Sequence, residues 1–388
     1  FSHFYARRIR RLVPALAATM VFTSAASMLF LPRELLLDFA RSQLAGTLYV
    51  ANVYFWSVAG YFDTSSYLKP LLHTWSLSVE EQFYAVWPLF LFLLKGRSPY
   101  WYIAAAGALS LVASEMVYSV SASTTFYMFP FRIFEFSIGA LINAIPTRSK
   151  SANTHAALLV LAVLMLACSI LLLDESSRLP GILNLPVCVA TAVIIWLAHP
   201  WANLRTGIFY PLLRVGLISY SAYLVHWPLV VFYKILVVEE LRWFDSALLV
   251  LATLVLAELS YRYVEQTFGR IKTGSRPRYW FAASLLVVVF AAVYLFAAPR
   301  VYSLMRSDDA GVQGILDNTP QRKGRIEQIR RDEGFPTRPE AAFKILVIGD
   351  SHAVDVALAL SWALSERDIG IDLKKNYCEP LTLNSLGK

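Results

Sequence analysis

Long apolar runs alternate with short polar connections from Phe1 to Pro299. A helix that crosses a bilayer needs about 20 mostly apolar residues, because lipid cannot satisfy exposed backbone polar groups. We expect the helix of the second run to extend back through the polar stretch before it. The pattern therefore predicts nine spanning helices, at 12–31, 83–95, 100–119, 126–145, 155–173, 181–198, 212–237, 244–263 and 279–298.

Basic residues are concentrated in alternate connections. When the first cluster (Arg7, Arg8, Arg10 and Arg11) is placed in the cytoplasm, the cytoplasmic connections hold 14 Lys and Arg and the outer connections five. Cytoplasmic loops of membrane proteins carry such an excess. This bias predicts that the chain after Pro299 lies outside.

The segment 35–56 does not fit the simple alternation. It is fairly apolar but carries Asp38, Arg41 and Gln43. If it crossed the membrane, every later loop would change sides and the charge bias would invert. We therefore predict an interfacial or re-entrant element on the outer side, buried against other helices.

The end of the chain has a different composition. Residues 300–342 are polar, which predicts an exposed connector. The run 343–349 is rich in β-branched residues and ends at a glycine, and 353–366 has apolar residues at helical spacing. Strand, tight turn and helix in this order predict the start of an α/β domain.

Composition agrees with a membrane protein. Hydrophobic residues make up 57% of the 388 residues and charged residues 16%, whereas soluble domains carry about 25% charged residues. The net charge of +8 suggests nucleic acid as a possible partner, but basic loops beside membrane spans explain it better, and no nucleic acid is expected. The three cysteines form no disulfide framework.

Ionisable residues inside membrane spans are costly and usually functional. The stretch His73–Tyr84 places a histidine, two glutamates and a glutamine at the mouth of a span. Arg132 and Glu135 lie three residues apart on one helical face, as do Tyr223 and His226. Arg132 and Glu135 could equally form a structural ion pair, and His226 could equally be a core histidine that bonds a carbonyl.

Four stretches carry a family resemblance, which covers about residues 1–270. They are Arg-Arg-Ile-Arg-Arg-Leu-Val-Pro (7–14), His-Thr-Trp-Ser-Leu-Ser-Val-Glu-Glu-Gln-Phe-Tyr (73–84), Phe-Arg-Ile-Phe-Glu-Phe-Ser-Ile-Gly (131–139) and Tyr-Ser-Ala-Tyr-Leu-Val-His-Trp-Pro (220–228). In order, they resemble the signature stretches of the membrane acyltransferase-3 family, whose bacterial members O-acylate cell-surface glycans.

The resemblance assigns roles to individual residues. Arg8 and Arg11 match an Arg-x-x-Arg motif that engages the acyl-coenzyme A donor at the cytoplasmic face, and guanidinium groups suit phosphate oxygens. In the membrane pocket, the expected catalytic residues are Glu80, Glu81 and His226, and the expected substrate-binding residues are His73, Trp75, Arg132, Glu135 and Tyr223. Two further family helices are expected upstream of Phe1.

The tail resembles the first block of an SGNH-hydrolase-type domain. Gly349-Asp350-Ser351-His352 gives Ser351 as the nucleophile. Between a strand and a helix, the hydroxyl would lie at a helix N-terminus, where backbone N–H groups can stabilise an oxyanion. The later blocks are expected beyond Lys388. The expected organisation is an acyltransferase-3-like membrane domain (1–270), an extra transmembrane helix (271–299), a linker (300–342) and the start of the SGNH-type domain (343–388).

Together, these features predict a mainly α polytopic protein of the bacterial inner membrane with a periplasmic tail. We expect it to move an acetyl group from cytoplasmic acetyl-CoA to hydroxyls of lipopolysaccharide O-antigen or a similar surface glycan, without a metal. Two alternatives stay open. One is a transporter for a lipid-linked intermediate, and the other is an outer domain that removes acetyl groups as an esterase.

Overall fold

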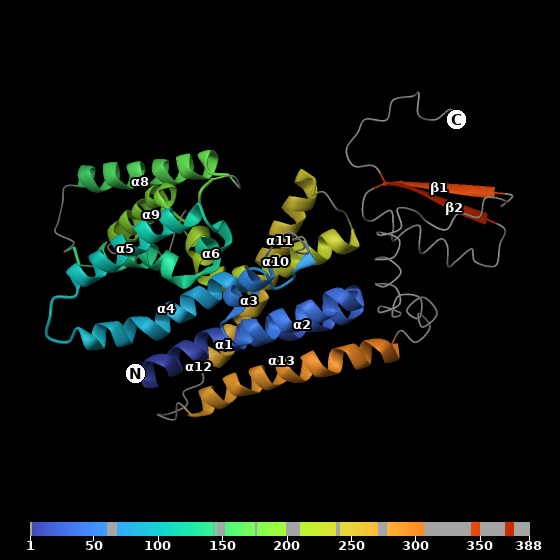
Figure 1. Ribbon diagram of the computed structural model, residues 1–388. Helices are drawn as coiled ribbons and strands as arrows, with labels where there is room; N and C mark the ends of the chain where they lie inside the picture. The colour runs from blue at the N-terminus through green and yellow to red at the C-terminus, as the bar shows by residue number, and fades with distance from the viewer. Residues whose placement is uncertain are drawn as a thin grey trace, which may run out of the picture. The chain divides into compact units, whose positions relative to one another are not determined.

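Figure 1 shows the chain as a computed structural model. The chain divides into two compact units, Phe1–Leu304 and Met305–Lys388. The structure describes residues 2–59, 68–142, 144–145, 152–174, 177–198, 210–237, 241–270, 278–305, 343–349 and 369–375.

The first unit is helical wherever the structure describes regular elements in it. Its helices follow the apolar runs of the sequence, with short 3-10 and π turns between some of them. In order they are α1 (Ser2–Phe30), α2 (Arg33–Thr47), α3 (Ala51–Val58), α4 (Thr74–Leu93), α5 (Tyr100–Tyr118), α6 (Ala122–Tyr127), η2 (Phe129–Arg132), α7 (Ile133–Ile142), α8 (Ala152–Leu172), η3 (Ile182–Asn184), α9 (Leu185–Ala198), α10 (Tyr210–Leu236), α11 (Trp243–Ser260), η5 (Tyr261–Glu265), α12 (Gln266–Arg270) and α13 (Arg278–Met305).

Several of these helices are long and apolar enough to cross a bilayer. On α8, Ile170, Leu171 and Leu172 are each more than three-quarters exposed, as expected for side chains that face lipid. A shorter apolar helix covers residues Ile182–Leu197. The protein is therefore a multi-pass membrane protein. Among the described residues the six long helices are Phe4–Phe30, Tyr100–Tyr118, Asn153–Leu172, Tyr210–Leu236, Trp243–Gly269 and Trp280–Leu304.

The structure extends one predicted helix and divides another. The helix expected at 83–95 begins at Thr74, which confirms its extension through the polar stretch. The single helix expected over 126–145 is wrong, because α6 ends at Tyr127 and α7 begins only at Ile133. Pro130 lies between them, in η2, where it lacks an N–H and restricts the residue before it.

The segment 35–56 forms two helices, α2 and α3, that meet at a sharp turn. Tyr49 has a positive φ of 55° in this turn. The 15 residues of α2 rise about 22 Å, which is less than the roughly 30 Å of a hydrocarbon core. The segment is therefore no continuous span, in agreement with the prediction of a re-entrant or interfacial element.

The core of the first unit lies where α1, α2, α4 and α10 meet. Phe39 of α2 and Leu224 of α10 are at most 2% exposed. At Gly46, an added Cβ would lie 3.1 Å from Cε of Met20, so α2 approaches α1 closely at that point. In Figure 1, α13 runs alongside α1 and α2, and the Tyr294 hydroxyl of α13 donates to the Ser24 carbonyl of α1. The central cluster consists of Ala15, Leu16, Met20, Leu31, Phe39, Leu71, Leu77 and Leu224.

The second unit contains two parallel strands, β1 (Phe343–Gly349) and β2 (Ile369–Lys375), paired from Phe343↔Ile369 to Gly349↔Lys375. The strand predicted at 343–349 is confirmed. Parallel strands require a crossover connection, as in an α/β domain. The helix expected at 353–366 and the Ser351 nucleophile lie outside the described residues.

Candidate active site

The first half of α4 carries the polar residues of the site, and hydrogen bonds fix its position against α3. The Ser78 hydroxyl accepts a bond from the Ala51 amide at 3.1 Å. The side-chain amides of Gln82 and Asn52 bond to each other, at 2.8 and 3.3 Å, and Gln82 also donates to the Tyr49 carbonyl. These contacts hold α4 in one rotation about its axis, which determines the direction of its remaining polar side chains.

Two histidines from distant parts of the chain meet at the start of α4. His73 immediately precedes α4, and His226 lies in α10. Their ring centroids are 5.6 Å apart. The Tyr223 hydroxyl donates to the His73 carbonyl at 2.5 Å and also contacts the Ser76 hydroxyl. We call His73, Ser76, Tyr223 and His226 the imidazole cluster.

His73 is deeply buried at the contact between α4 and α10. It is 6% exposed and interacts with the backbone of Leu224 in α10. Burial, with a smaller contribution from the neighbouring His226, lowers the pKa of His73 well below its usual range.

The orientation of His226 determines which of its nitrogens can act as a base. Its Nδ1 atom lies 2.6 Å from the Tyr223 carbonyl oxygen. Because a carbonyl only accepts, we assign the proton to Nδ1, and the lone pair then lies on Nε2. One ring nitrogen of His226 therefore bonds a backbone carbonyl, as expected for a core histidine. The other ring nitrogen carries the lone pair.

A second polar cluster lies further along α4. The Nε atom of Arg8 is 3.3 Å from Oε1 of Glu81, and the Arg8 guanidinium lies over the ring of Tyr84. Glu80 is exposed, and its charge interacts with those of Glu81 and Arg8. We call Arg8, Glu80, Glu81 and Tyr84 the carboxylate cluster. Because Arg11 lies three residues after Arg8 in α1, both guanidinium groups occupy one side of that helix.

Arg132 and Glu135 form an ion pair away from the two histidines. Nη1 of Arg132 is 3.0 Å from Oε1 of Glu135, which also accepts a bond from Asn184 at 2.7 Å. The Nε and Nη2 atoms of Arg132 donate to the Phe126 carbonyl, and its guanidinium lies 5.2 Å from the Trp75 ring centroid. These contacts join α4, α6, α7 and η3. The Arg132–Glu135 pair therefore has the geometry of an ion pair that stabilises the packing of these elements.

The structure adds a site that the sequence interpretation does not assign. Glu265 ends the π-helical turn η5 and is 9% exposed. The fully buried Ser221 of α10 donates a hydrogen bond to it, and the Ser221 oxygen lies 2.8 Å from that of Ser260. The positive charge of Arg11 also acts on Glu265. Single π turns occur often at functional sites. The signal in the sequence is a glutamate at the end of an apolar run, but no spacing rule links it to Ser221.

The arrangement therefore combines a membrane-embedded helical bundle with two polar clusters along α4, to which α1 and α10 also contribute residues. Residues 1–262 match the family described as an acyltransferase domain, and the chain belongs to this acyltransferase-3 family. The enzyme class expected from the sequence, a transferase that acylates hydroxyl groups, agrees with this membership.

The chain is similar to several curated proteins. The "Putative peptidoglycan O-acetyltransferase YrhL" of Bacillus subtilis is 30% identical over 76% of this chain and 51% of its own length. The peptidoglycan O-acetyltransferase OatA of Listeria monocytogenes is 29% identical over 68% of this chain and 46% of its own. The "Putative membrane-bound transacylase BcsY" of Komagataeibacter xylinus is 28% identical over 68% of both chains.

The chain spans about half the length of the two peptidoglycan O-acetyltransferases. No solved structure matches it. The match with YrhL covers more of the chain than the family region does, but neither comparison shows the SGNH-type domain expected after residue 343.

Proposed function

We propose that the protein transfers an acetyl group from cytoplasmic acetyl-CoA to a hydroxyl of a glycan on the opposite side of the membrane. The family membership supports acyl transfer, and the names of YrhL and OatA support acetyl as the group and peptidoglycan as the acceptor. Peptidoglycan is thus favoured over the O-antigen expected from the sequence. The expected charge bias places the basic N-terminal cluster inside and the tail outside, provided that the divided segment α6–α7 still crosses the membrane.

The donor binds at the carboxylate cluster. Arg8 and Arg11 present two guanidinium groups from one helix side, which suits the phosphates of coenzyme A. Glu81 and Tyr84 hold the Arg8 side chain in place before the donor arrives, so less conformational entropy is lost when the phosphates bind.

Helix α4 connects the donor site to the imidazole cluster. Eight residues separate His73 from Glu81, which corresponds to about 12 Å of helix rise. In this proposal, the thioester end of an extended donor enters along α4 between Glu81 and His73. Polar side chains of α1 and α10 face α4 along this route.

The transfer needs a proton acceptor for the attacking hydroxyl. As the hydroxyl oxygen forms a bond to the acetyl carbon, its proton passes to an imidazole lone pair. The carbon–sulfur bond then breaks, and the thiolate of coenzyme A takes up that proton. His226 can serve here, because its Nδ1 faces the Tyr223 carbonyl and its lone pair then lies on Nε2.

We propose Ser351, the nucleophile expected from the sequence, as the acetyl carrier that forms an acetyl-enzyme and passes the acetyl group to the glycan. Such a relay divides one difficult transfer into two easier ones. It would join a cytoplasmic donor to an outer nucleophile within one chain.

The orientation of His226 beside the buried His73 is the observation that carries this proposal. The test uses the full-length enzyme in membrane vesicles, with labelled acetyl-CoA on the cytoplasmic side and peptidoglycan on the other. His226→Gln should lower acetyl transfer by roughly a hundredfold or more, the usual scale of a lost acid–base group. His155→Gln on α8 is the matched control. Transfer at the wild-type rate in His226→Gln would refute the assignment.

A further inference from the structure

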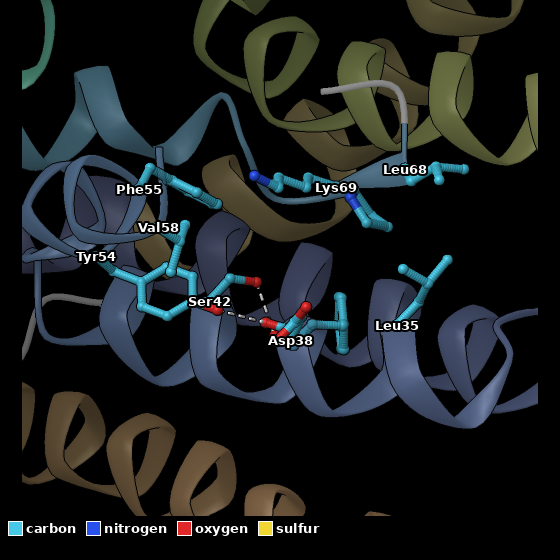
Figure 2. Close-up of a pocket in the computed structure, with 10 residues that line it drawn as sticks. Leu35, Asp38, Ser42, Tyr54, Phe55, Val58, Leu68 and Lys69 are labelled. Atoms are coloured by element: carbon cyan, nitrogen blue, oxygen red, sulfur yellow. Dashed lines mark hydrogen bonds between the residues drawn. The ribbon is translucent and has the colours of Figure 1, made fainter. Parts of the chain in front are cut away.

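A polar pocket lies beside the imidazole cluster, between α2, α3 and the segment that leads into α4. It has a volume of about 130 Å³. Figure 2 shows Asp38 and Lys69 on opposite sides of it, with Tyr54 and Val58 on one flank and Leu35 and Leu68 on the other.

We infer that this pocket binds one sugar ring of the acceptor glycan, an inference that rests on the proposed function. The volume is somewhat below the 150 Å³ of an engineered cavity that binds benzene, so the pocket holds part of one pyranose ring and leaves its substituents outside. The pocket is partly open, so a hydroxylated ring can enter it while the rest of the glycan stays outside.

The charges in the pocket favour a neutral ligand. Asp38 supplies acceptor oxygens and Lys69 supplies N–H donors, so the pair offers both halves of the hydrogen bonds that sugar hydroxyls make. A pocket built for a phosphate or a carboxylate would instead hold basic groups without an opposing acid. The Asp38 carboxylate is only loosely paired with Arg41, at 3.6 Å, and its side chain is 47% exposed.

The remaining walls include the side chains of Leu35, Tyr54, Val58 and Leu68, which suit the apolar face of a sugar ring. Phe55 is 2% exposed and supports Tyr54 by edge-to-face packing, with ring centroids 5.3 Å apart. The Tyr54 hydroxyl donates to the Asp38 carbonyl, and the Ser42 hydroxyl donates to the Phe39 carbonyl. These bonds, drawn in Figure 2, fix the wall formed by α2 and α3 before a ligand binds.

The pocket is tied to the imidazole cluster through the backbone. The Lys69 carbonyl accepts a hydrogen bond from the indole N–H of Trp227 at 2.9 Å, and Trp227 directly follows His226. The chain from Lys69 to His73 is a tight turn, with the Leu72 amide bonded to the Lys69 carbonyl. A ring bound against Lys69 is therefore held against the same segment that positions His73.

The experiment measures binding and turnover separately in the full-length enzyme in nanodiscs. The probe is a trimer of N-acetylglucosamine, with binding followed by saturation-transfer NMR and acetyl transfer followed in the presence of acetyl-CoA. Asp38→Asn and Lys69→Gln should each weaken trimer binding about tenfold, the scale of one lost charge-assisted hydrogen bond. The rate at which acetyl-CoA is hydrolysed without acceptor should stay within twofold. Asp174→Asn, the same change at a residue outside the pocket, should leave both unchanged.

Three results would overturn the pocket assignment. In the first, the wild-type enzyme does not bind the trimer. In the second, Asp38→Asn and Lys69→Gln bind the trimer as well as the wild type does. In the third, glycerophosphoethanolamine competes with the trimer, which would indicate that the pocket binds a zwitterionic lipid headgroup. Failure of the proposed function would look different, because the trimer would bind and depend on Asp38 while the wild-type enzyme showed no turnover of acetyl-CoA.

Discussion

The hydroxyl of Tyr223 reaches the backbone carbonyl of His73 at 2.5 Å, although the two residues belong to different helical regions of the bundle. Together with the bond from Trp227 to Lys69, this contact fastens the turn before α4 to α10 at two points. The position of the His73 ring therefore depends on α10 as much as on its own backbone.

This relationship predicts that Tyr223→Phe lowers acetyl transfer without unfolding the protein. The ring keeps its packing against His73 and His226, but the bond to the His73 carbonyl and the contact with Ser76 are lost. We expect transfer to fall about fivefold, since the bond contributes about 1 kcal/mol to a fixed geometry. Tyr263→Phe, at a tyrosine that is 71% exposed, is the control in the same vesicle assay. An unchanged rate in Tyr223→Phe would show that the tyrosine does not position His73.

Arg8 should determine the affinity for acetyl-CoA. Arg8→Lys keeps the positive charge but loses the planar fork and its stacking on Tyr84. We expect the KM for acetyl-CoA to rise about tenfold while kcat stays within a few-fold. The exposed Arg7, changed to Lys, is the control. If kcat fell and KM did not change, Arg8 would act in the chemical step and not in donor binding.

Ser221 should stabilise the bundle through Glu265. Ser221→Ala leaves the buried Glu265 without that hydrogen bond, which should lower the free energy of unfolding by about 1–3 kcal/mol. Ser219→Ala is a close control, because the Ser219 hydroxyl is exposed and bonds only to a carbonyl of its own helix. Denaturant unfolding in detergent measures both. Equal stability of the two variants would mean that the bond to Ser221 adds nothing to the fold.

Much of the membrane fold could be predicted from the length of apolar runs. The helices at Tyr100–Tyr118, Asn153–Leu172 and Tyr210–Leu236 lie where the runs place them, because burial in lipid leaves the backbone no alternative to a helix. The break between α6 and α7 was missed because apolar residues continue through it. Pro130 was the local signal there: it has no N–H to donate to the Phe126 carbonyl, which lies four residues earlier, and Arg132 donates to that carbonyl instead.

The site could be predicted only in part. Spacing shows that Arg132 and Glu135, or Tyr223 and His226, share a helical face, and both pairs are close in the structure. Spacing does not show which faces of different helices meet. The approach of His73 to His226 and of Ser221 to Glu265 depends on long-range packing, through the cluster around Leu77 and Leu224 and through the π turn η5.

The relay predicts that Ser351→Ala abolishes glycan acetylation in cells that express the full-length enzyme. An alanine cannot form the acetyl-enzyme, so the acetyl group has no route to the glycan if every transfer passes through this hydroxyl. Mass spectrometry of the surface glycan measures acetyl content, with Ser361→Ala as the control for a nearby serine. Undiminished acetylation in Ser351→Ala would exclude the relay and leave direct transfer at the imidazole cluster. A higher acetyl content than in wild type would instead show that the outer domain removes acetyl groups, because an esterase with the same nucleophile runs the chemistry in the opposite direction.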